Sequence, residues 1–315
     1  MLASGDEGGA GDAPRARDVV LIAGPTASGK SALALRLADA LDGVVVNADA
    51  MQVYAGLRVL TARPSAEDEA RAPHRLYGTV DPARAYSVAD WLADIAPVLQ
   101  APGIKVVVGG TGLYFSALTE GLSEMPPVPD EIRAHWRARA VEEGPEALHA
   151  VLAARDPQMA ARLRPSDPQR LSRALEVLDA TGRSLRDWQA RRSRPLVVRQ
   201  ARRFVLAPDR AWLHRRIEAR LDDMVGEGAI DEALALTARG LPADRPALKA
   251  LGVSALTAAA RGEMALSDAV SLTARDTRRF AKRQETWFRN QFADWPRAAP
   301  DDESVDVIAE RILNA

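Results

Sequence analysis

A glycine-rich segment, Gly24 to Ser31, has the composition of a phosphate-binding loop. It reads GPTASGKS, which matches a glycine, four free positions, Gly-Lys and a hydroxyl residue. In such a loop the backbone N–H groups turn inward, and the following helix directs its positive end at the same place. Lys30 adds a positive charge, and the Ser31 hydroxyl can ligate a Mg²⁺ ion that bridges two phosphate oxygens. The segment therefore predicts a site for ATP, another nucleotide or a different phosphate ester, formed by Gly24, Pro25, Thr26, Ala27, Ser28, Gly29, Lys30 and Ser31.

A second candidate is Asp49, which ends an apolar run and opens the segment DAMQVY. A carboxylate beside a bound pyrophosphate can accept a proton or hold Mg²⁺ through water. Three residues on, Gln52 carries an amide that can pair with an edge of adenine. Simpler interpretations are a turn or helix N-cap for Asp49 and a surface polar residue for Gln52. The residues alone leave both interpretations open.

Thr111 lies in the segment GGTGLY, directly after two glycines. Its hydroxyl can hydrogen-bond a ligand at a place where the backbone must approach closely, or it can cap a helix. Further along, Asp167 and Pro168 have the types expected at the start of a helix. Arg170 and Arg173 are three residues apart, so they share one face of that helix, which is either solvated or a binding surface.

The elements that must position these residues alternate between strand and helix. Residues 18–23, 43–49 and 104–110 are short apolar runs, and residues 31–41 and 87–100 have helical spacing. We therefore predict an α/β fold with a P-loop NTPase-like parallel sheet covered on both faces. The glycine loop, Asp49 and Gly109-Gly110-Thr111 all follow strands, and ligands of such sheets bind at the carboxyl ends of the strands.

The character of the chain changes after a proline-rich segment at residues 125–130. Residues 131–200 are rich in Arg and Ala and lack a strand pattern, so they predict a helical insertion. Residues 203–208 predict a strand that returns to the sheet, and the remainder predicts helices. The predicted organisation is a disordered tail (1–17), a core domain (18–130 and 201–315) and a helical insertion (131–200).

The charge distribution suggests a polyanionic partner. The whole chain has a net charge of −1, but residues 162–203 hold twelve arginines against four acids, a local charge of +8. A second basic stretch covers residues 277–292. Basic patches on a near-neutral chain are typical of nucleic-acid binding. The alternative is a solvated helix face, because only four of the 42 basic residues are Lys and arginine is favoured throughout.

Several classes of protein are disfavoured by what the sequence lacks. It has no cysteine, which excludes disulfides and thiolate metal sites and fits a cytoplasmic protein. No apolar stretch approaches the length of a membrane span, and the N-terminus lacks the apolar core of a secretory signal. We therefore expect no membrane association. The histidines are too far apart for a local zinc motif: His74, His135, His149 and His214.

Three functions fit a phosphate loop of this kind. The chain has no Asn-Lys-x-Asp segment to bind guanine, so a GTPase is disfavoured. A nucleotide or small-metabolite kinase remains, with Asp49 as its strand-end acid, and so does an RNA-binding module that hydrolyses ATP. A small acceptor, however, would not require a +8 segment of some forty residues.

The motifs in this order resemble one family, the tRNA dimethylallyltransferases, also called tRNA isopentenyltransferases. The resemblance extends from Val19 to about Trp295. The matching segments are GPTASGKS (24–31), NADAMQVY (47–54), TARP (61–64), APHRL (72–76), DP and YS (81–87), VVGGTGLYFSAL (107–118), DPQRLSRALEV (167–177) and AKRQETWFR (281–289).

The resemblance implies transfer of a five-carbon chain from dimethylallyl pyrophosphate to the exocyclic N6 amine of an adenosine 3′-adjacent to the anticodon, in tRNAs for codons that start with U. It implies that residues 26–31 hold the pyrophosphate with Mg²⁺, that Asp49 is the general base and that Thr111 assists at the reacting centre. It also implies a cytoplasmic monomer, although the residues themselves do not fix the oligomeric state. The residues implied to contact tRNA are Asp49, Ala50, Met51, Gln52, Thr111, Arg133, Gln169, Arg170, Leu171, Ser172 and Arg173.

The chain departs from the family pattern at three places. Ala50 stands where a Ser is usual, and Leu60 stands where a Gly commonly precedes the TARP segment. The usual Gly-Tyr-basic stretch appears as Gly252-Val253-Ser254, which puts contacts from that region in doubt. None of these changes affects the phosphate loop, Asp49 or Thr111.

Overall fold

The computed structural model describes residues 18–197 and 201–314, and the predicted tail at residues 1–17 lies outside them. The described residues form two compact units, one made of residues 18–119, 196–197 and 201–314, the other of Glu120–Pro195. The second unit starts and ends earlier than the predicted insertion of residues 131–200, because its two connecting segments pair with each other. Ser123 and Arg192 form an isolated antiparallel β-bridge, and the Ser193 N–H donates to the Leu122 carbonyl at 2.8 Å.

The larger unit is built on a parallel sheet of six strands in the order β3-β2-β4-β1-β5-β6. The predicted parallel α/β core is confirmed. Two edge strands were not predicted, because each has only two residues and shows no sequence pattern. The strands are β1 (Val19–Ala23), β2 (Val44–Asn47), β3 (His74–Arg75), β4 (Lys105–Gly109), β5 (Arg202–Leu206) and β6 (Arg297–Ala298).

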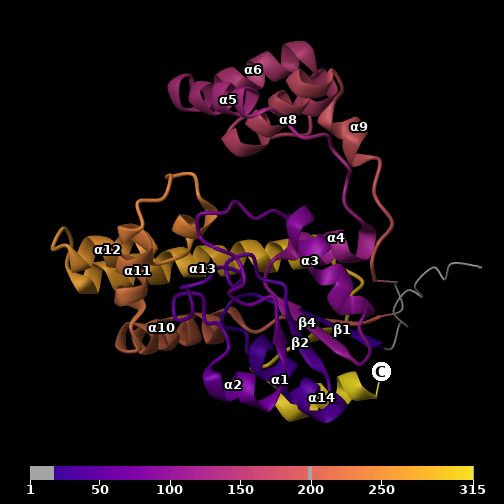
Figure 1. The fold of residues 1–315 in the computed structure, drawn as a ribbon, viewed down its shortest axis with the longest axis vertical. Coiled ribbons are helices and arrows are strands. Elements are labelled where there is room, and N and C mark those ends of the chain that lie inside the picture. The colour runs from indigo at the N-terminus through magenta and orange to yellow at the C-terminus, as the bar shows by residue number, and fades with distance from the viewer. Residues whose placement is uncertain (1–17, 198–200, 315) are drawn as a thin grey trace, which may run out of the picture. The chain divides into compact units, whose positions relative to one another are not determined.

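Helices cover both faces of this sheet (Figure 1). On one face, α1 (Lys30–Leu41) and α14 (Val305–Leu313) pack against alternate strand residues such as Ile22. On the other face, α3 (Val88–Gln100), α4 (Gly112–Glu120) and the end of α13 (Leu266–Gln291) pack against residues such as Leu21. Burial on both faces explains why the strands are continuously apolar rather than alternating.

A group of helices extends beyond the carboxyl edge of the sheet. It comprises α10 (Arg210–Gly226), α11 (Ala229–Ala238), the 3₁₀ turn Pro246–Lys249, α12 (Val253–Ala260) and α13. Gly228 lies between α10 and α11 and has a φ of 102°. This left-handed conformation is inexpensive only for glycine, so the chain turns there and starts a second helix. A further short helix, α2 (Ala66–Arg71), follows the TARP segment.

The smaller unit is helical, as predicted, and has its own core. In α8 (Pro168–Thr181) the Asp167 side chain accepts from the Arg170 N–H at 3.1 Å and Pro168 is the first helical residue, which confirms the predicted helix start. Within the described residues, no helix of either unit is long and apolar enough to cross a membrane. The helices of the smaller unit are α5 (Asp130–Glu142), α6 (Gly144–Arg155), α7 (Pro157–Ala160), α8 (Pro168–Thr181) and α9 (Leu185–Gln189).

Candidate active site

The predicted phosphate loop joins the centre of the sheet to a helix N-terminus. It runs from the end of β1 to Gly29, which has a φ of 86° and caps the twelve-residue helix α1. The Ser28 N–H donates to the Pro25 carbonyl at 3.3 Å, which closes the loop. The positive end of α1 therefore faces the space that the loop surrounds, an arrangement suited to an anion.

Lys30 is held close to this loop rather than extended into solvent. Its Nζ donates to the Pro25 carbonyl at 3.1 Å. Burial lowers the pKa of Lys30 to about 8, Asp49 acts in the opposite direction, and the positive charge of Arg220 lowers it further. An anionic ligand at the loop would favour the protonated form of this amine.

Asp49 lies at the carboxyl end of β2 in a tightly constrained turn. The Asn47 side chain accepts from the Asp49 N–H at 2.8 Å and donates to the Asp49 carbonyl at 3.0 Å. Asp49 Oδ1 accepts from the Met51 N–H at 2.9 Å, so the turn interpretation of Asp49 is correct. Among the described residues, the second oxygen, Oδ2, has no hydrogen-bond donor. Asp49 can therefore form the turn and still present one oxygen to a ligand.

Thr111 supports the same turn from the neighbouring strand. Its Oγ1 accepts from the Ala50 N–H at 2.9 Å, and its own N–H donates to the Ala48 carbonyl at 3.2 Å. The Thr111 hydroxyl hydrogen is not used in these bonds. The GGTG segment therefore holds the Asp49 turn in place and leaves one donor for a ligand.

Two arginines that the sequence analysis did not single out reach the phosphate loop from α10. Arg220 Nη2 donates to Thr26 Oγ1 at 2.6 Å, and Arg216 Nε donates to the Ala27 carbonyl at 3.0 Å. Burial, together with Arg216, lowers the pKa of Arg220 to about 10, which leaves it charged at neutral pH. The loop is thus surrounded by three cations, Lys30, Arg216 and Arg220.

Two cavities adjoin at Asp49. The phosphate-loop cavity, of about 380 Å³, is lined by Lys30, Ser31, Arg216 and other polar groups. The apolar cavity, of about 500 Å³, is lined by side chains such as Leu221, Phe280 and Trp287. Four residues line both cavities, and they mark the place where the two spaces meet: Thr26, Asp49, Thr61 and Arg220.

Gln52 lies on the phosphate-loop side and is largely committed to the protein. Its Nε2 donates to the carbonyls of Thr61 and Ala62, each at 2.9 Å. Only its amide oxygen remains to accept a hydrogen bond, and the residue does not line the apolar cavity. The structure thus gives Gln52 a role in holding the TARP segment, beside the contact with adenosine that the resemblance implies.

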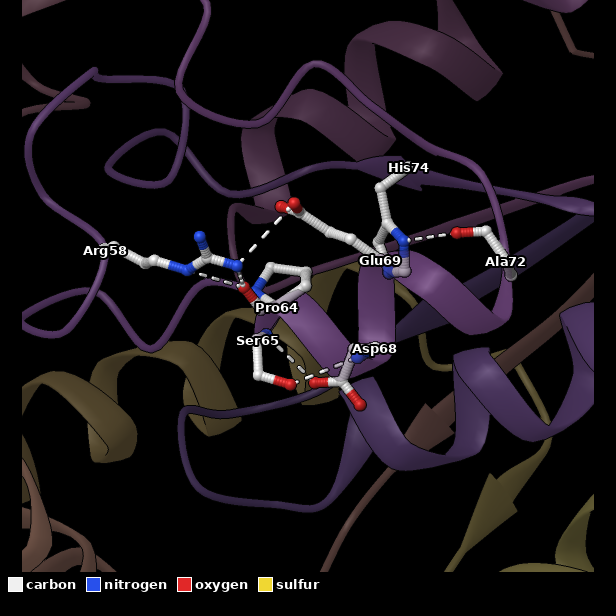
Figure 2. Close-up of polar contacts among 7 residues, drawn as sticks. All are labelled: Arg58, Pro64, Ser65, Asp68, Glu69, Ala72 and His74. Atoms are coloured by element: carbon white, nitrogen blue, oxygen red, sulfur yellow. Dashed lines mark hydrogen bonds and ion pairs between the residues drawn. The ribbon is translucent and has the colours of Figure 1, made fainter.

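The segment after residue 57 is fastened by its own polar side chains (Figure 2). Arg58 donates through Nε and Nη2 to the Pro64 carbonyl at 3.0 and 2.7 Å and lies 3.6 Å from the Glu69 carboxylate. Ser65 and Asp68 form a reciprocal capping box at the start of α2. These contacts fix the backbone that carries Thr61 and Ala62 to the border of the cavities.

The oxygen ligands around the phosphate-loop cavity suit a hard cation. Ser31, the predicted Mg²⁺ ligand, lines this cavity together with the carboxylates of Asp49 and Asp223. Mg²⁺ is usually bound by one or two carboxylates plus phosphate oxygens and water. The residues present therefore fit a Mg²⁺ ion that arrives with a phosphate ligand.

The smaller unit carries the remaining predicted residues on α5 and α8. Gln169 and Arg170 are exposed, but Leu171 is fully buried in the core of this unit and Ser172 is buried beside it. The Leu171 and Ser172 side chains therefore pack inside the unit instead of facing a partner. Arg133 lies 3.5 Å from Asp130, and the half-buried Arg173 lies 3.6 Å from Glu176.

Family models and curated relatives that match this chain all point to one family. A model described as IPP transferase matches residues 52–291, and one described as isopentenyl transferase matches residues 17–83. A tRNA dimethylallyltransferase of Azorhizobium caulinodans is 55% identical over 287 residues, covering 90% of this chain and 92% of the relative. One of Mesorhizobium japonicum is 50% identical over 317 residues and covers 99% of this chain and 98% of the relative.

Solved structures show the same fold. The full-length tRNA isopentenylpyrophosphate transferase of Bacillus halodurans superposes with a TM-score of 0.67 at 33% identity, covering 95% of both chains. A eukaryotic dimethylallyltransferase acting on tRNA superposes with a TM-score of 0.72 at 24% identity, covering 86% of this chain and 70% of the other.

Proposed function

Because the chain belongs to the IPP transferase family, we propose that it transfers a dimethylallyl group from dimethylallyl pyrophosphate to tRNA. The acceptor is the exocyclic N6 amine of the adenosine 3′-adjacent to the anticodon, in tRNAs for codons that start with U, and the leaving group is pyrophosphate. The kinase alternative is not favoured, because the relatives at 50–55% identity are named tRNA dimethylallyltransferases.

The observation that carries this proposal is the position of Asp49 where two unlike cavities adjoin. The phosphate-loop cavity, with Lys30, Arg216 and Arg220, suits the pyrophosphate. The apolar cavity suits the five-carbon chain and the flat face of an adenine. A donor that spans the two cavities would place its reacting carbon near Asp49.

The chemistry requires a base and a stabilised leaving group at the same time. The N6 lone pair is delocalised into the adenine ring, so the amine is a weak nucleophile. As the new N–C bond forms, the C–O bond to pyrophosphate breaks and its electron pair leaves with the phosphate oxygen. Asp49 accepts the proton that N6 releases, while Lys30, Arg216 and Arg220 stabilise the charge that develops on the pyrophosphate.

Mg²⁺ would supply further charge neutralisation at the phosphate oxygens. Ser31 and Asp223 are the residues that would hold it, since their oxygens line the same cavity and Asp49 is assigned the proton. Thr111 keeps the Asp49 turn in place through the Ala50 N–H, and its remaining hydroxyl donor can hydrogen-bond the reacting group.

The tRNA contact is proposed to involve the helical unit. Gln169 and Arg170 present exposed polar groups near the start of α8, and Arg133 and Arg173 add positive charge. The target base must leave its stack to reach an active site. The protein must therefore bind the RNA on either side of that base. We place the reaction in the cytoplasm and expect a monomer, in line with the absence of cysteine and the resemblance described above.

Incubation with labelled dimethylallyl pyrophosphate or labelled ATP, with and without bulk tRNA, tests the proposal. We expect the prenyl label to appear in RNA only when both tRNA and enzyme are present. Turnover of ATP without transfer of the prenyl label would support a kinase or an ATPase instead. Nucleoside analysis of the product would identify the modified adenosine.

A further inference from the structure

We propose that Gln284 of α13 is a positioning residue that holds the two catalytic loops at a fixed separation. The loops are the phosphate loop at Thr26 and the Gly110-Thr111 segment. This inference rests on the proposed function, because it assigns Gln284 a part in the transfer step. Gln284 also lines the apolar cavity, but both polar atoms of its amide are used by the two loops. Gln284 was not a candidate from the sequence, although it lies in the matching segment AKRQETWFR.

One amide connects the two loops directly. Gln284 Oε1 accepts from the Thr26 N–H at 2.9 Å, and Gln284 Nε2 donates to the Gly110 carbonyl at 2.9 Å. The side chain is 5% exposed, so water competes little for either bond. Both partners are backbone groups, so the bonds fix the paths of the loops themselves.

The Gly110-Thr111-Gly112 segment is shaped to receive this helix. A Cβ built at Gly110 would lie 2.1 Å from Gln284 Nε2, and one built at Gly112 would lie 2.1 Å from the Trp287 ring. Gln284 and Trp287 are three residues apart and share one face of α13. Glycines on both sides of Thr111 therefore allow the helix to approach the loop closely.

From Gly110 the connection continues to the proposed base. Thr111 follows Gly110 and accepts from the Ala50 N–H at 2.9 Å, and Ala50 follows Asp49. At the other end of the amide, Thr26 also accepts from Arg220 through its hydroxyl at 2.6 Å. Gln284 thus links the group that binds the donor to the group that carries the base.

The chemistry of the position explains the residue type. The site needs an acceptor toward Thr26 and a donor toward Gly110 on one planar group, and a primary amide supplies both. An ionised glutamate supplies only acceptors and adds a negative charge close to Asp49. A protonated glutamate can again donate through its O–H group, so its behaviour should depend on pH.

The experiment compares Gln284→Met and Gln284→Glu with Gln291→Met, an exposed glutamine on the same helix, as the matched control. Single-turnover prenyl transfer is measured at saturating donor and tRNA from pH 6 to pH 8, with melting temperatures taken in parallel. We expect Gln284→Met to transfer at least about tenfold more slowly at every pH, because small displacements of reacting groups are costly. Gln291→Met should match the wild type.

For Gln284→Glu, we expect the rate relative to wild type to rise at least about threefold from pH 8 to pH 6, since burial brings the pKa of a carboxyl group into this range. This recovery is not expected of a residue that only supports folding. A wild-type transfer rate for Gln284→Met, or a ratio for Gln284→Glu that does not change with pH, would overturn the inference. The Glu variant keeps the test valid if the Met variant does not fold. Absence of transfer by the wild type in the same assay would instead refute the proposed function.

Discussion

At the scale of single residues, the two carboxylate oxygens of Asp49 have different surroundings. Oδ1 is used in the turn through the Met51 N–H, and Oδ2 lies toward Gly110, where a built Cβ would be 3.3 Å away. The turn interpretation and the general-base hypothesis are therefore compatible. The first fixes the carboxylate, and the second uses the oxygen that remains.

Replacing Asp49 with Asn separates these two roles. The amide oxygen can still accept from Met51, so the turn and donor binding should persist, while the basicity is lost. We expect single-turnover transfer at saturating tRNA to fall at least about a hundredfold. Asp222→Asn, an exposed change on α10, is the control and should have no effect.

A Mg²⁺ titration distinguishes the base from a metal ligand. If Asp49 only held Mg²⁺, excess metal would restore much of the rate of the Asn variant, and donor affinity would fall at low metal. Near-normal turnover by the variant at any Mg²⁺ concentration would move the proton acceptor to another residue or to the pyrophosphate.

A second prediction at this scale concerns Lys30 and the pH dependence of donor binding. With a pKa of about 8 in the free protein, Lys30 is mostly protonated at pH 7 and mostly neutral above pH 9. Only the protonated amine attracts pyrophosphate, so the Kd of the donor should be constant below about pH 8 and rise at higher pH. In Lys30→Arg the guanidinium stays charged, and the rise near pH 8 should disappear. Calorimetric titrations with pyrophosphate at several pH values measure this, and an unchanged rise in the Arg variant would assign the titration to another group.

At the scale of elements, α10 presents two different stripes to the two cavities. Arg216, Arg220 and Asp223 line the phosphate-loop cavity, and Ile217, Leu221 and Met224 line the apolar cavity. Each set repeats at three- and four-residue intervals, so each lies along one side of the helix. A single helix thus contributes both a charged wall and an apolar wall.

Removing Arg220 should therefore affect donor binding and the chemical step together. The charge on the pyrophosphate is present in the substrate and increases as the bond breaks, so Arg220→Ala should raise the donor KM and also lower kcat. Arg215→Ala on the same helix is exposed and lines neither cavity, so it should behave as the wild type. If Arg220→Ala raised the donor KM but left kcat unchanged, Arg220 would bind the substrate and the transition state equally and would not assist the chemical step.

The contributions of α10 and α13 also show what the sequence could not predict. The phosphate loop and the turns at Asp49 and Thr111 are marked by local patterns at strand ends, and these were found. Arg220 meets Thr26 across 194 residues, and Gln284 meets Thr26 across 258 residues. Local spacing does not indicate that either residue contacts the phosphate loop, because such contacts arise only when the helices pack. The edge strands β3 and β6 were not predicted for a different reason: each has only two residues, which is too short to show any periodicity.

At the scale of the whole molecule, the residues assigned to the chemistry all belong to one of the two units, and the smaller unit as a whole has a net charge of only +1, from thirteen arginines and twelve acids. Asp49, the phosphate loop, α10 and α13 all belong to the larger unit, and every residue that lines the two cavities lies there. Much of the segment with a net charge of +8 belongs to the smaller unit. Donor binding should therefore be independent of substitutions on the smaller unit.

Arg170 tests this independence. It is exposed near the start of α8 and lies 3.3 Å from the Asp167 carboxylate, a pair that solvent screens. If Arg170 contacts one tRNA phosphate, Arg170→Ala should weaken tRNA binding and reduce the slope of log affinity against log salt by about 0.7–0.9, while the donor KM stays constant. Arg311→Ala on α14, whose partner is Glu303, is the matched control and should leave the slope unchanged. Filter binding with bulk tRNA over a range of salt concentrations measures the slopes. If Arg170→Ala and Arg311→Ala give the wild-type slope, Arg170 does not contact the RNA backbone, and the exposed arginines elsewhere on the smaller unit become the next to test.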